Sequence, residues 1–169
     1  MYVLIDRPWA APALILAASA AALAFAFTAQ YGFGLEPCVL CLYQRWPFAI
    51  AVLLGGLGLA LAATGRSPAW VLALAGAVFL ANAGLAFYHV GVEQHWWQGT
   101  AECTAEIGRA RSLAELKAQV LAAPLVRCDE VAWSLFGLSM AAWNVALSAA
   151  LALFSLVAAG RLSRQGGRR

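Results

Sequence analysis

Two cysteines three residues apart, Cys38 and Cys41, stand in the stretch EPCVLCLYQRWPF at the edge of a long apolar segment. On one helical turn this spacing places two side chains about 5–6 Å apart on the same face, close enough for a disulfide. A helix N-terminus and Arg45, four residues after Cys41, both favour a thiolate, the reactive form in thiol exchange. We therefore predict a redox-active pair in which Cys41 is the thiolate.

The other two cysteines of the chain are Cys103 and Cys128. A disulfide between them would close a loop, and an exposed, strained disulfide tends to be oxidising. Cys103 lies in the polar, acidic stretch GTAECTAE, so we expect another protein to reach it. If the loop lets Cys128 approach Cys38, the two pairs can exchange.

Other uses of the cysteines are less consistent with the sequence. A c-type haem site needs a histidine directly after the second cysteine, where this chain has Leu42. A structural zinc site would need all four cysteines, but Cys103 and Cys128 do not form a second C-x-x-C motif. A static disulfide staple remains an alternative, although it leaves the arginine beside the pair unexplained. We predict no bound metal.

The elements that position these cysteines are predicted from the spacing of charges. The chain has 169 residues, of which 63% are hydrophobic and 11% charged, too few polar residues to cover a water-soluble globule of this size. A membrane-spanning helix needs roughly 20 apolar residues, and uncharged windows of 28, 20, 26 and 30 residues occur at 8–35, 46–65, 67–92 and 131–160. We predict one integral membrane domain, residues 1–169, with uncleaved spans at about 10–30, 46–63, 69–90 and 139–159.

Four spans place two loops, about 31–45 and 91–138, on one side of the membrane. Seven of the eight acidic residues and all four cysteines fall in these loops, as expected of an oxidising outer compartment. The opposite side, with both termini, carries Arg7, Arg66, Arg161, Arg164, Arg168 and Arg169. By the positive-inside rule that side is cytoplasmic. The net charge of +3 thus reflects topology, and no basic groove indicates a nucleic-acid partner.

The expected fold is an all-α, four-transmembrane-helix up-down bundle with a long outer loop that carries a short surface helix. That helix is predicted from Ser112, because Glu115 follows three residues later in a capping-box pattern. We expect Asn82 and Asn144 to form hydrogen bonds between spans. We expect small residues to let the helices approach closely, namely Gly55, Gly56, Gly58, Gly76 and Gly84.

Two thiols can lose electrons only to an acceptor near the thiolate, and the chain has no nucleotide-binding motif. The bilayer itself holds quinones as two-electron acceptors. Arg45 would stabilise negative charge developing on a quinone carbonyl. His89, near the outer end of the third span, would donate to the same ring, although an interfacial role without such a contact remains open.

These residues resemble the bacterial disulfide bond formation protein B (DsbB) family. The resemblance covers most of the chain, through PCVLCLYQR, YHVGVE and WSLFGLSMAAWN in this order. It implies that Cys38 and Cys41 form the quinone-coupled pair, with Cys41 and Arg45 next to the quinone. It also implies that Cys103 forms the mixed disulfide with a DsbA-like periplasmic oxidase, and that Cys128 is its partner.

The resemblance implies a protein dithiol:quinone oxidoreductase of the bacterial inner membrane, which uses ubiquinone or menaquinone from the membrane quinone pool. It also implies that the long outer loop is periplasmic. Two alternatives remain at this point. One is an enzyme similar to vitamin K epoxide reductase, which usually keeps its C-x-x-C in a late helix. The other is a non-catalytic membrane scaffold whose disulfides staple its outer loops.

Overall fold

The computed structural model describes residues 7–100, 103, 112–114, 117 and 126–166. Its helices are α2 (Ala10–Phe27), the π-helical turn η1 (Thr28–Gly32), α3 (Val39–Tyr43), α4 (Arg45–Ala63), α5 (Ala69–Glu93) and α7 (Met140–Gly166). α2 continues into η1, and α3 is separated from α4 by Gln44 alone, so the described residues contain four long apolar helical segments of 23 to 26 residues. Each is long enough to cross a bilayer.

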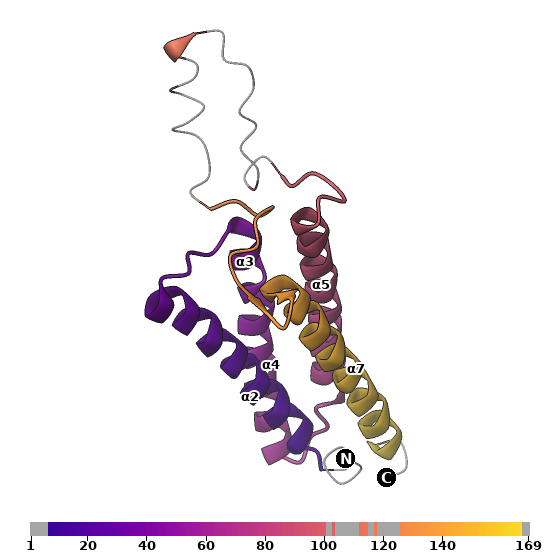
Figure 1. Ribbon diagram of the computed structural model, residues 1–169. Helices are drawn as coiled ribbons and strands as arrows, with labels where there is room; N and C mark the ends of the chain where they lie inside the picture. Colours follow the sequence, from indigo (N-terminus) through magenta and orange to yellow (C-terminus); the bar gives the residue numbers. More distant parts are fainter. Residues whose placement is uncertain (1–6, 101–102, 104–111, 115–116, 118–125, 167–169) are drawn as a thin grey trace.

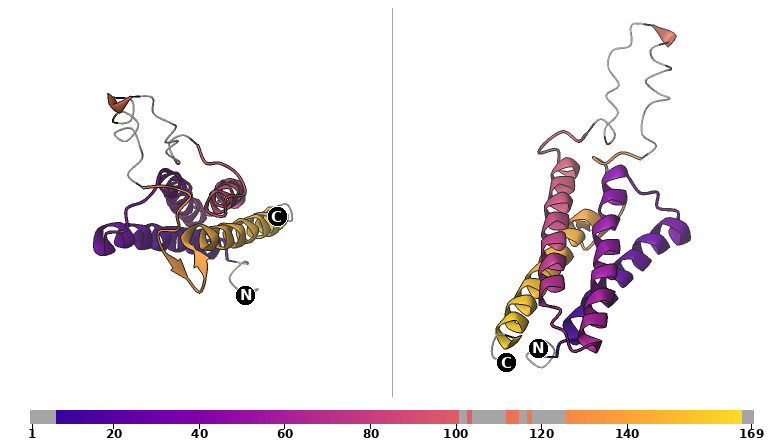
Figure 2. Two further views of the ribbon diagram at one scale, coloured as in Figure 1. Left: turned by 45° about the horizontal axis from the view of Figure 1, so that its top comes forward. Right: turned by 180° about the vertical axis from the view of Figure 1, so that it is seen from behind.

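The four segments form an up-down bundle, as the sequence predicted. α2 packs against α4, α4 against α5, and α5 most extensively against α7. The chain enters and leaves the bundle at the same end, where the turn between α4 and α5 also lies (Figure 1). α2 leans away from α4 toward the opposite end (Figures 1 and 2).

The outer faces of these helices are apolar as well. Leu53 is 74% exposed and Leu153 is 66% exposed, and both lie within long helices. Inside the bundle, the rings of Phe48 and Phe79 pack edge to face with their centroids 5.9 Å apart. Helices that are hydrophobic on every side need an apolar solvent, so the protein is a multi-pass membrane protein.

Close helix contacts depend on some, but not all, of the predicted glycines. A Cβ on Gly55 would lie 2.8 Å from the backbone nitrogen of Leu16, and one on Gly58 would lie 2.8 Å from Pro12. Gly76 is equally tight, and Gly56 would make only an ordinary contact. The prediction for Gly84 is wrong, because a Cβ there would meet nothing within 4 Å.

A small β-hairpin departs from the all-helical expectation. β1 (Ser134–Leu135) pairs antiparallel with β2 (Leu138–Ser139). Phe136 and Gly137 connect them with φ values of 53° and 77°, the left-handed pair that a type I′ turn requires. The Trp143 indole donates a 3.1 Å hydrogen bond to the Leu135 carbonyl, which fixes the hairpin to the first turn of α7.

The predicted surface helix lies mostly outside the described residues, Glu115 included. Within the predicted helix, three described residues are helical, namely Leu113, Ala114 and Lys117.

Candidate active site

The Cys38–Cys41 pair occupies the first turn of α3. Cys38 is the N-cap residue, and its sulfur accepts a hydrogen bond from the Cys41 backbone N–H at 3.4 Å. The two Sγ atoms lie 3.0 Å apart, so the expected proximity is confirmed. The pair can form a disulfide without rearrangement of the backbone between them.

His89 and Glu93, one turn apart on α5, lie beside this pair. The Nε2 atom of His89 is 3.6 Å from the Cys38 sulfur and 3.9 Å from Glu93 Oε1. The other carboxylate oxygen of Glu93 accepts a 2.5 Å hydrogen bond from the Ser139 hydroxyl, which in turn accepts from the Ala142 N–H at the start of α7. The sequence predicted that His89 donates to a quinone next to Cys41. Of the two sulfurs of the pair, the one in contact with His89 is that of Cys38.

The contacts of the dithiol favour Cys38 as the thiolate. A hydrogen bond from the Cys41 thiol, helped by His89 and by the Cys41 backbone N–H, lowers the pKa of Cys38 to about 4. The sequence argument assigned the thiolate to Cys41, next to the quinone; the contacts of the dithiol favour Cys38, and the role of Cys41 beside a quinone stays a prediction. The helix begins at Cys38, so its free N–H groups act on that sulfur first.

The second pair lies against the first. Cys103 and Cys128 form a disulfide, and the Cys128 N–H donates a 3.0 Å hydrogen bond to the Cys103 carbonyl. Both cysteines are fully buried, in a cluster with Cys38, Leu40 and Val92. Cys103 was expected to be exposed; instead, packing of the disulfide on this apolar cluster covers it. The cluster brings the two redox pairs together.

A cavity of about 390 Å³ opens on the other side of the Cys38–Cys41 pair. Its walls are the C-terminal half of α2, the first turns of α4 and α7, and the hairpin, at the end where α2 leans away from α4 (Figures 1 and 2). Most lining side chains are apolar, including Leu23, Phe48 and Leu147. Of the pair, Cys41 lines this cavity and Cys38 does not.

Arg45 and His89 also line the cavity. Arg45 Nη1 donates a 2.6 Å hydrogen bond to Gln30 Oε1, and the guanidinium lies 5.2 Å from the centre of the Phe27 ring. The cavity therefore combines apolar walls with a cation, an imidazole, a thiol, the Glu36 carboxylate and the amides of Gln44 and Asn144. This set suits a flat, apolar ring that carries carbonyl oxygens, so the residues present fit a quinone.

A network of amides and one hydroxyl extends from His89 into the bundle. Gln44 lies 2.9 Å from His89 Nδ1 and accepts a 2.5 Å hydrogen bond from Asn144. Asn144 in turn accepts from Asn82 and Ser148. Interhelical hydrogen bonds were predicted for Asn82 and for Asn144, but neither their contact with each other nor the link to His89 was predicted. The available signal was that Gln44, three residues after Cys41, is a polar side chain at the start of an apolar span.

Two further features leave the Cys38–Cys41 pair and its cavity as the candidate active site. Ligand atoms of Cys38, Cys41 and His89 lie within 4.8 Å of one another, near enough to share a thiophilic metal ion, but the four-cysteine zinc site is ruled out because Cys103 and Cys128 are bonded to each other.

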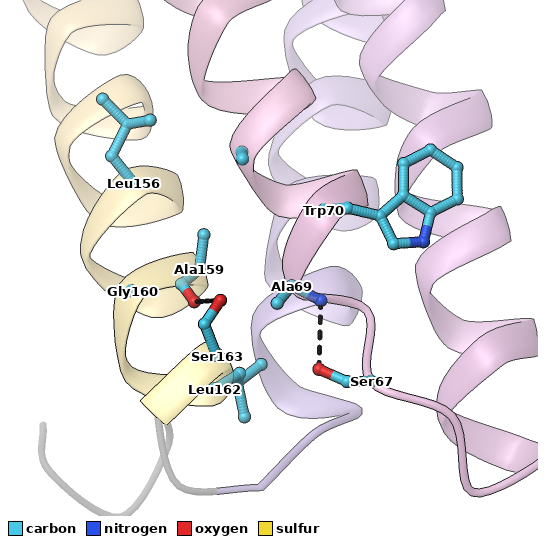
Figure 3. A pocket seen from close by; sticks show the side chains of 9 residues that line it. Ser67, Ala69, Trp70, Leu156, Ala159, Gly160, Leu162 and Ser163 are labelled. Atoms are coloured by element: carbon cyan, nitrogen blue, oxygen red, sulfur yellow. Dashed lines mark hydrogen bonds between the residues drawn. The ribbon is translucent and has the colours of Figure 1, made fainter. Parts of the chain in front are cut away.

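A second hollow, of about 570 Å³, lies between the start of α5 and the end of α7 (Figure 3). Its lining residues include no cysteine and no ionisable side chain.

Comparison with known proteins agrees with this geometry. Residues 8–158 match the model of the family "Disulfide bond formation protein DsbB". The chain belongs to the DsbB family. Curated relatives named disulfide bond formation protein B come from Acidovorax sp. (35% identity; 88% of this chain and 87% of the relative), Xanthomonas axonopodis pv. citri (33%; 87% and 87%) and Polaromonas naphthalenivorans (30%; 96% and 97%). No solved structure gives a significant match.

Membership of the DsbB family settles the reaction class. The protein is a disulfide-forming oxidoreductase with two cysteine pairs, embedded in a membrane by four spans. This supports the DsbB resemblance over the scaffold and the vitamin K epoxide reductase-like alternatives.

Proposed function

We propose that this protein is a quinone-dependent thiol oxidase that reoxidises a periplasmic DsbA-like dithiol protein. The observation that carries the proposal is the placement of the Cys38–Cys41 pair between two different surroundings. Both cysteines pack with the Cys103–Cys128 disulfide, Cys38 within its cluster and Cys41 against it, and Cys41 also lines the cavity with Arg45 and His89. The pair therefore connects a site of thiol exchange with a site for an apolar acceptor.

Electrons enter through the second pair. A thiolate of the reduced partner attacks the Cys103 sulfur, which forms a mixed disulfide and releases Cys128 as a thiolate. Because Cys103 is buried in the structure, this step requires its sulfur to become exposed to the partner. Cys128 then attacks Cys38 of the oxidised Cys38–Cys41 pair, which releases Cys41 as a thiolate at the cavity wall. The partner's second thiol displaces Cys103, so that the partner leaves as a disulfide. Cys103 then attacks Cys128, which restores the Cys103–Cys128 disulfide and leaves Cys38 and Cys41 reduced.

Reoxidation of Cys38 and Cys41 requires an acceptor beside Cys41. When bound, a quinone supplies a two-electron, two-proton acceptor, so that one partner dithiol becomes a disulfide for each quinone reduced to hydroquinone. Arg45 would orient a ring carbonyl and stabilise negative charge that develops on its oxygen. Cys38, whose pKa is lowered by its contacts with Cys41 and His89, is the nucleophile that closes the disulfide on Cys41.

We assign the end of the bundle with both termini to the cytoplasm and the cysteine end to the periplasm of a bacterial inner membrane. The support is the charge distribution, because Arg7, Arg66, Arg161 and Arg164 lie at the first end, while Glu36, Glu93, Asp129 and Glu130 lie at the other.

The proposal is tested with purified protein, a reduced DsbA-like partner and ubiquinone or menaquinone. We expect catalytic oxidation of the partner and stoichiometric quinone reduction in the wild type, and loss of quinone reduction in Cys41→Ser. In Cys128→Ser, Cys103 is left as a free thiol, so oxidation of the partner should stop, because no Cys103–Cys128 disulfide remains for the partner thiolate to attack. Turnover that survives Cys41→Ser would contradict the proposal, as would a wild type that never reduces quinone.

A further inference from the structure

The hydrogen bonds of the buried amide network run in one direction from Asn82, whose own Oδ1 is buried without a partner among the described residues, to His89. Asn82 donates to Asn144 Oδ1 at 3.3 Å and to the Ser148 hydroxyl at 2.9 Å, and the Ser148 hydroxyl donates to Asn144 Oδ1 at 2.9 Å. Asn144 Oδ1 thus accepts two hydrogen bonds, from Asn82 and Ser148. The NH₂ group of Asn144 donates to Gln44 Oε1 at 2.5 Å. The group of Gln44 that lies 2.9 Å from His89 Nδ1 is consequently its NH₂ group, Nε2.

This direction of the hydrogen bonds decides which nitrogen of His89 carries the proton. An amide NH₂ group has no lone pair to offer, so it bonds only to a ring nitrogen that is itself unprotonated. Nδ1 must accept, and in a neutral imidazole the proton then resides on Nε2.

The contacts on the opposite side of the His89 ring independently support a proton on Nε2. Nε2 faces the Cys38 sulfur at 3.6 Å and the Glu93 carboxylate at 3.9 Å, and a thiolate and a carboxylate both accept hydrogen bonds. His89 is only 3% exposed, so water has little access to either nitrogen. A donor meets Nδ1 and acceptors meet Nε2, and the two sides require the same tautomer.

We propose that Gln44 and Asn144 are positioning residues that hold His89 as the tautomer protonated on Nε2, with this N–H directed at the Cys38 sulfur. The N–H stabilises the Cys38 thiolate, the nucleophile that closes the disulfide on Cys41. That consequence rests on the proposed function, whereas the tautomer itself does not. Asn144 acts through Gln44, and Gln44 acts through His89.

The tautomer is read directly from the ¹⁵N chemical shifts of the imidazole ring in the reduced, full-length protein in lipid nanodiscs. The chain has two histidines, and His95→Asn leaves the His89 ring as the single signal. Asparagine suits position 95, where φ is 58°. We expect a protonated Nε2 and an unprotonated Nδ1. A proton on Nδ1 in this protein would overturn the proposal.

Two substitutions in the same background test the positioning residues. In Gln44→Glu a carboxylate faces Nδ1 and can only accept, so Nδ1 should become protonated. In Asn144→Asp the new carboxylate cannot donate to Gln44, so the Gln44 amide should turn its oxygen toward His89 and also protonate Nδ1. Asn144→Asp provides the test if Gln44→Glu does not fold. Gln94→Glu, an exposed residue just after α5, is the matched control and should leave the shifts unchanged.

A folded Gln44→Glu or Asn144→Asp protein with wild-type ring shifts would show that the network does not set the tautomer, and would overturn the proposal. Failure of the proposed function can be distinguished from failure of this tautomer proposal. In that case the ring shifts follow the expected pattern while wild-type protein does not reduce quinone.

Discussion

Arg45 at the start of α4 donates a 2.6 Å hydrogen bond to Gln30 in η1. This contact joins two of the elements that wall the cavity, on the side where α2 leans away from α4. The Phe27 ring, 5.2 Å away, further restricts the guanidinium. The cation is thus held at the cavity wall before any ligand arrives, which reduces the ordering that binding requires.

Removal of this cation should weaken quinone binding. A hydrogen bond to a charged group contributes about 1.5–3 kcal/mol, so we expect Arg45→Met to raise the KM for quinone by about 10-fold to 100-fold. The measurement is quinone reduction at saturating partner protein, with KM and kcat determined separately. Arg164→Met, at the far end of α7, is the matched control. An unchanged KM for Arg45→Met would show that the guanidinium does not touch the quinone.

The contact between α2 and α4 depends on the absence of a side chain at Gly55. An alanine there would place Cβ 2.8 Å from the Leu16 backbone, and backbone cannot move aside as a flexible side chain can. We expect Gly55→Ala to destabilise the bundle by about 1–3 kcal/mol, measured by detergent-induced unfolding. Gly84→Ala is the matched control, because its Cβ meets nothing within 4 Å. It should be neutral or stabilise by up to about 1 kcal/mol, since alanine is the better helix former.

The Cys38 thiolate should persist in mild acid. With the pKa at about 4, the folded protein leaves Cys38 unprotonated where an unfolded thiol, with its ordinary value of 9.0, binds a proton. By linkage, this contribution to the stability of the reduced protein is complete above pH 9 and declines as the pH falls toward about 4. Thiolate absorbance near 240 nm should therefore remain at pH 5–6 in reduced protein that carries Cys103→Ala and Cys128→Ala.

The neighbours of Cys38 provide controls for this titration. His89→Ala removes one of the groups that lower the pKa, so the midpoint should move upward. His95→Asn, on a residue not in contact with the pair among the contacts described, should leave it in place. A wild-type midpoint in the ordinary thiol range would show that the Cys41 and His89 contacts do not stabilise the thiolate.

The sequence determined the four apolar helices and the proximity of Cys38 and Cys41, because both depend on local quantities. The length of an uncharged run decides whether a helix can span a bilayer, and a C-x-x-C on one turn brings its sulfurs together whatever surrounds it. The interhelical hydrogen bond of Asn82 was also accessible, because an amide in an apolar span requires a partner. Gly84 shows the limit of this argument, since composition does not tell which face of a helix meets a neighbour.

The tertiary structure alone decided how the site is assembled. Sequence spacing could not show that Cys38 lies in the cluster of the Cys103–Cys128 disulfide or that Cys41, packed against this cluster, also lines the cavity, because those neighbours come from distant parts of the chain. The choice of Cys38 as the thiolate depends on the cap position and on His89, 51 residues away. The Gln44 contact with His89 likewise joins residues 45 positions apart. Such directional contacts require the relative rotation of packed helices, which no local pattern encodes.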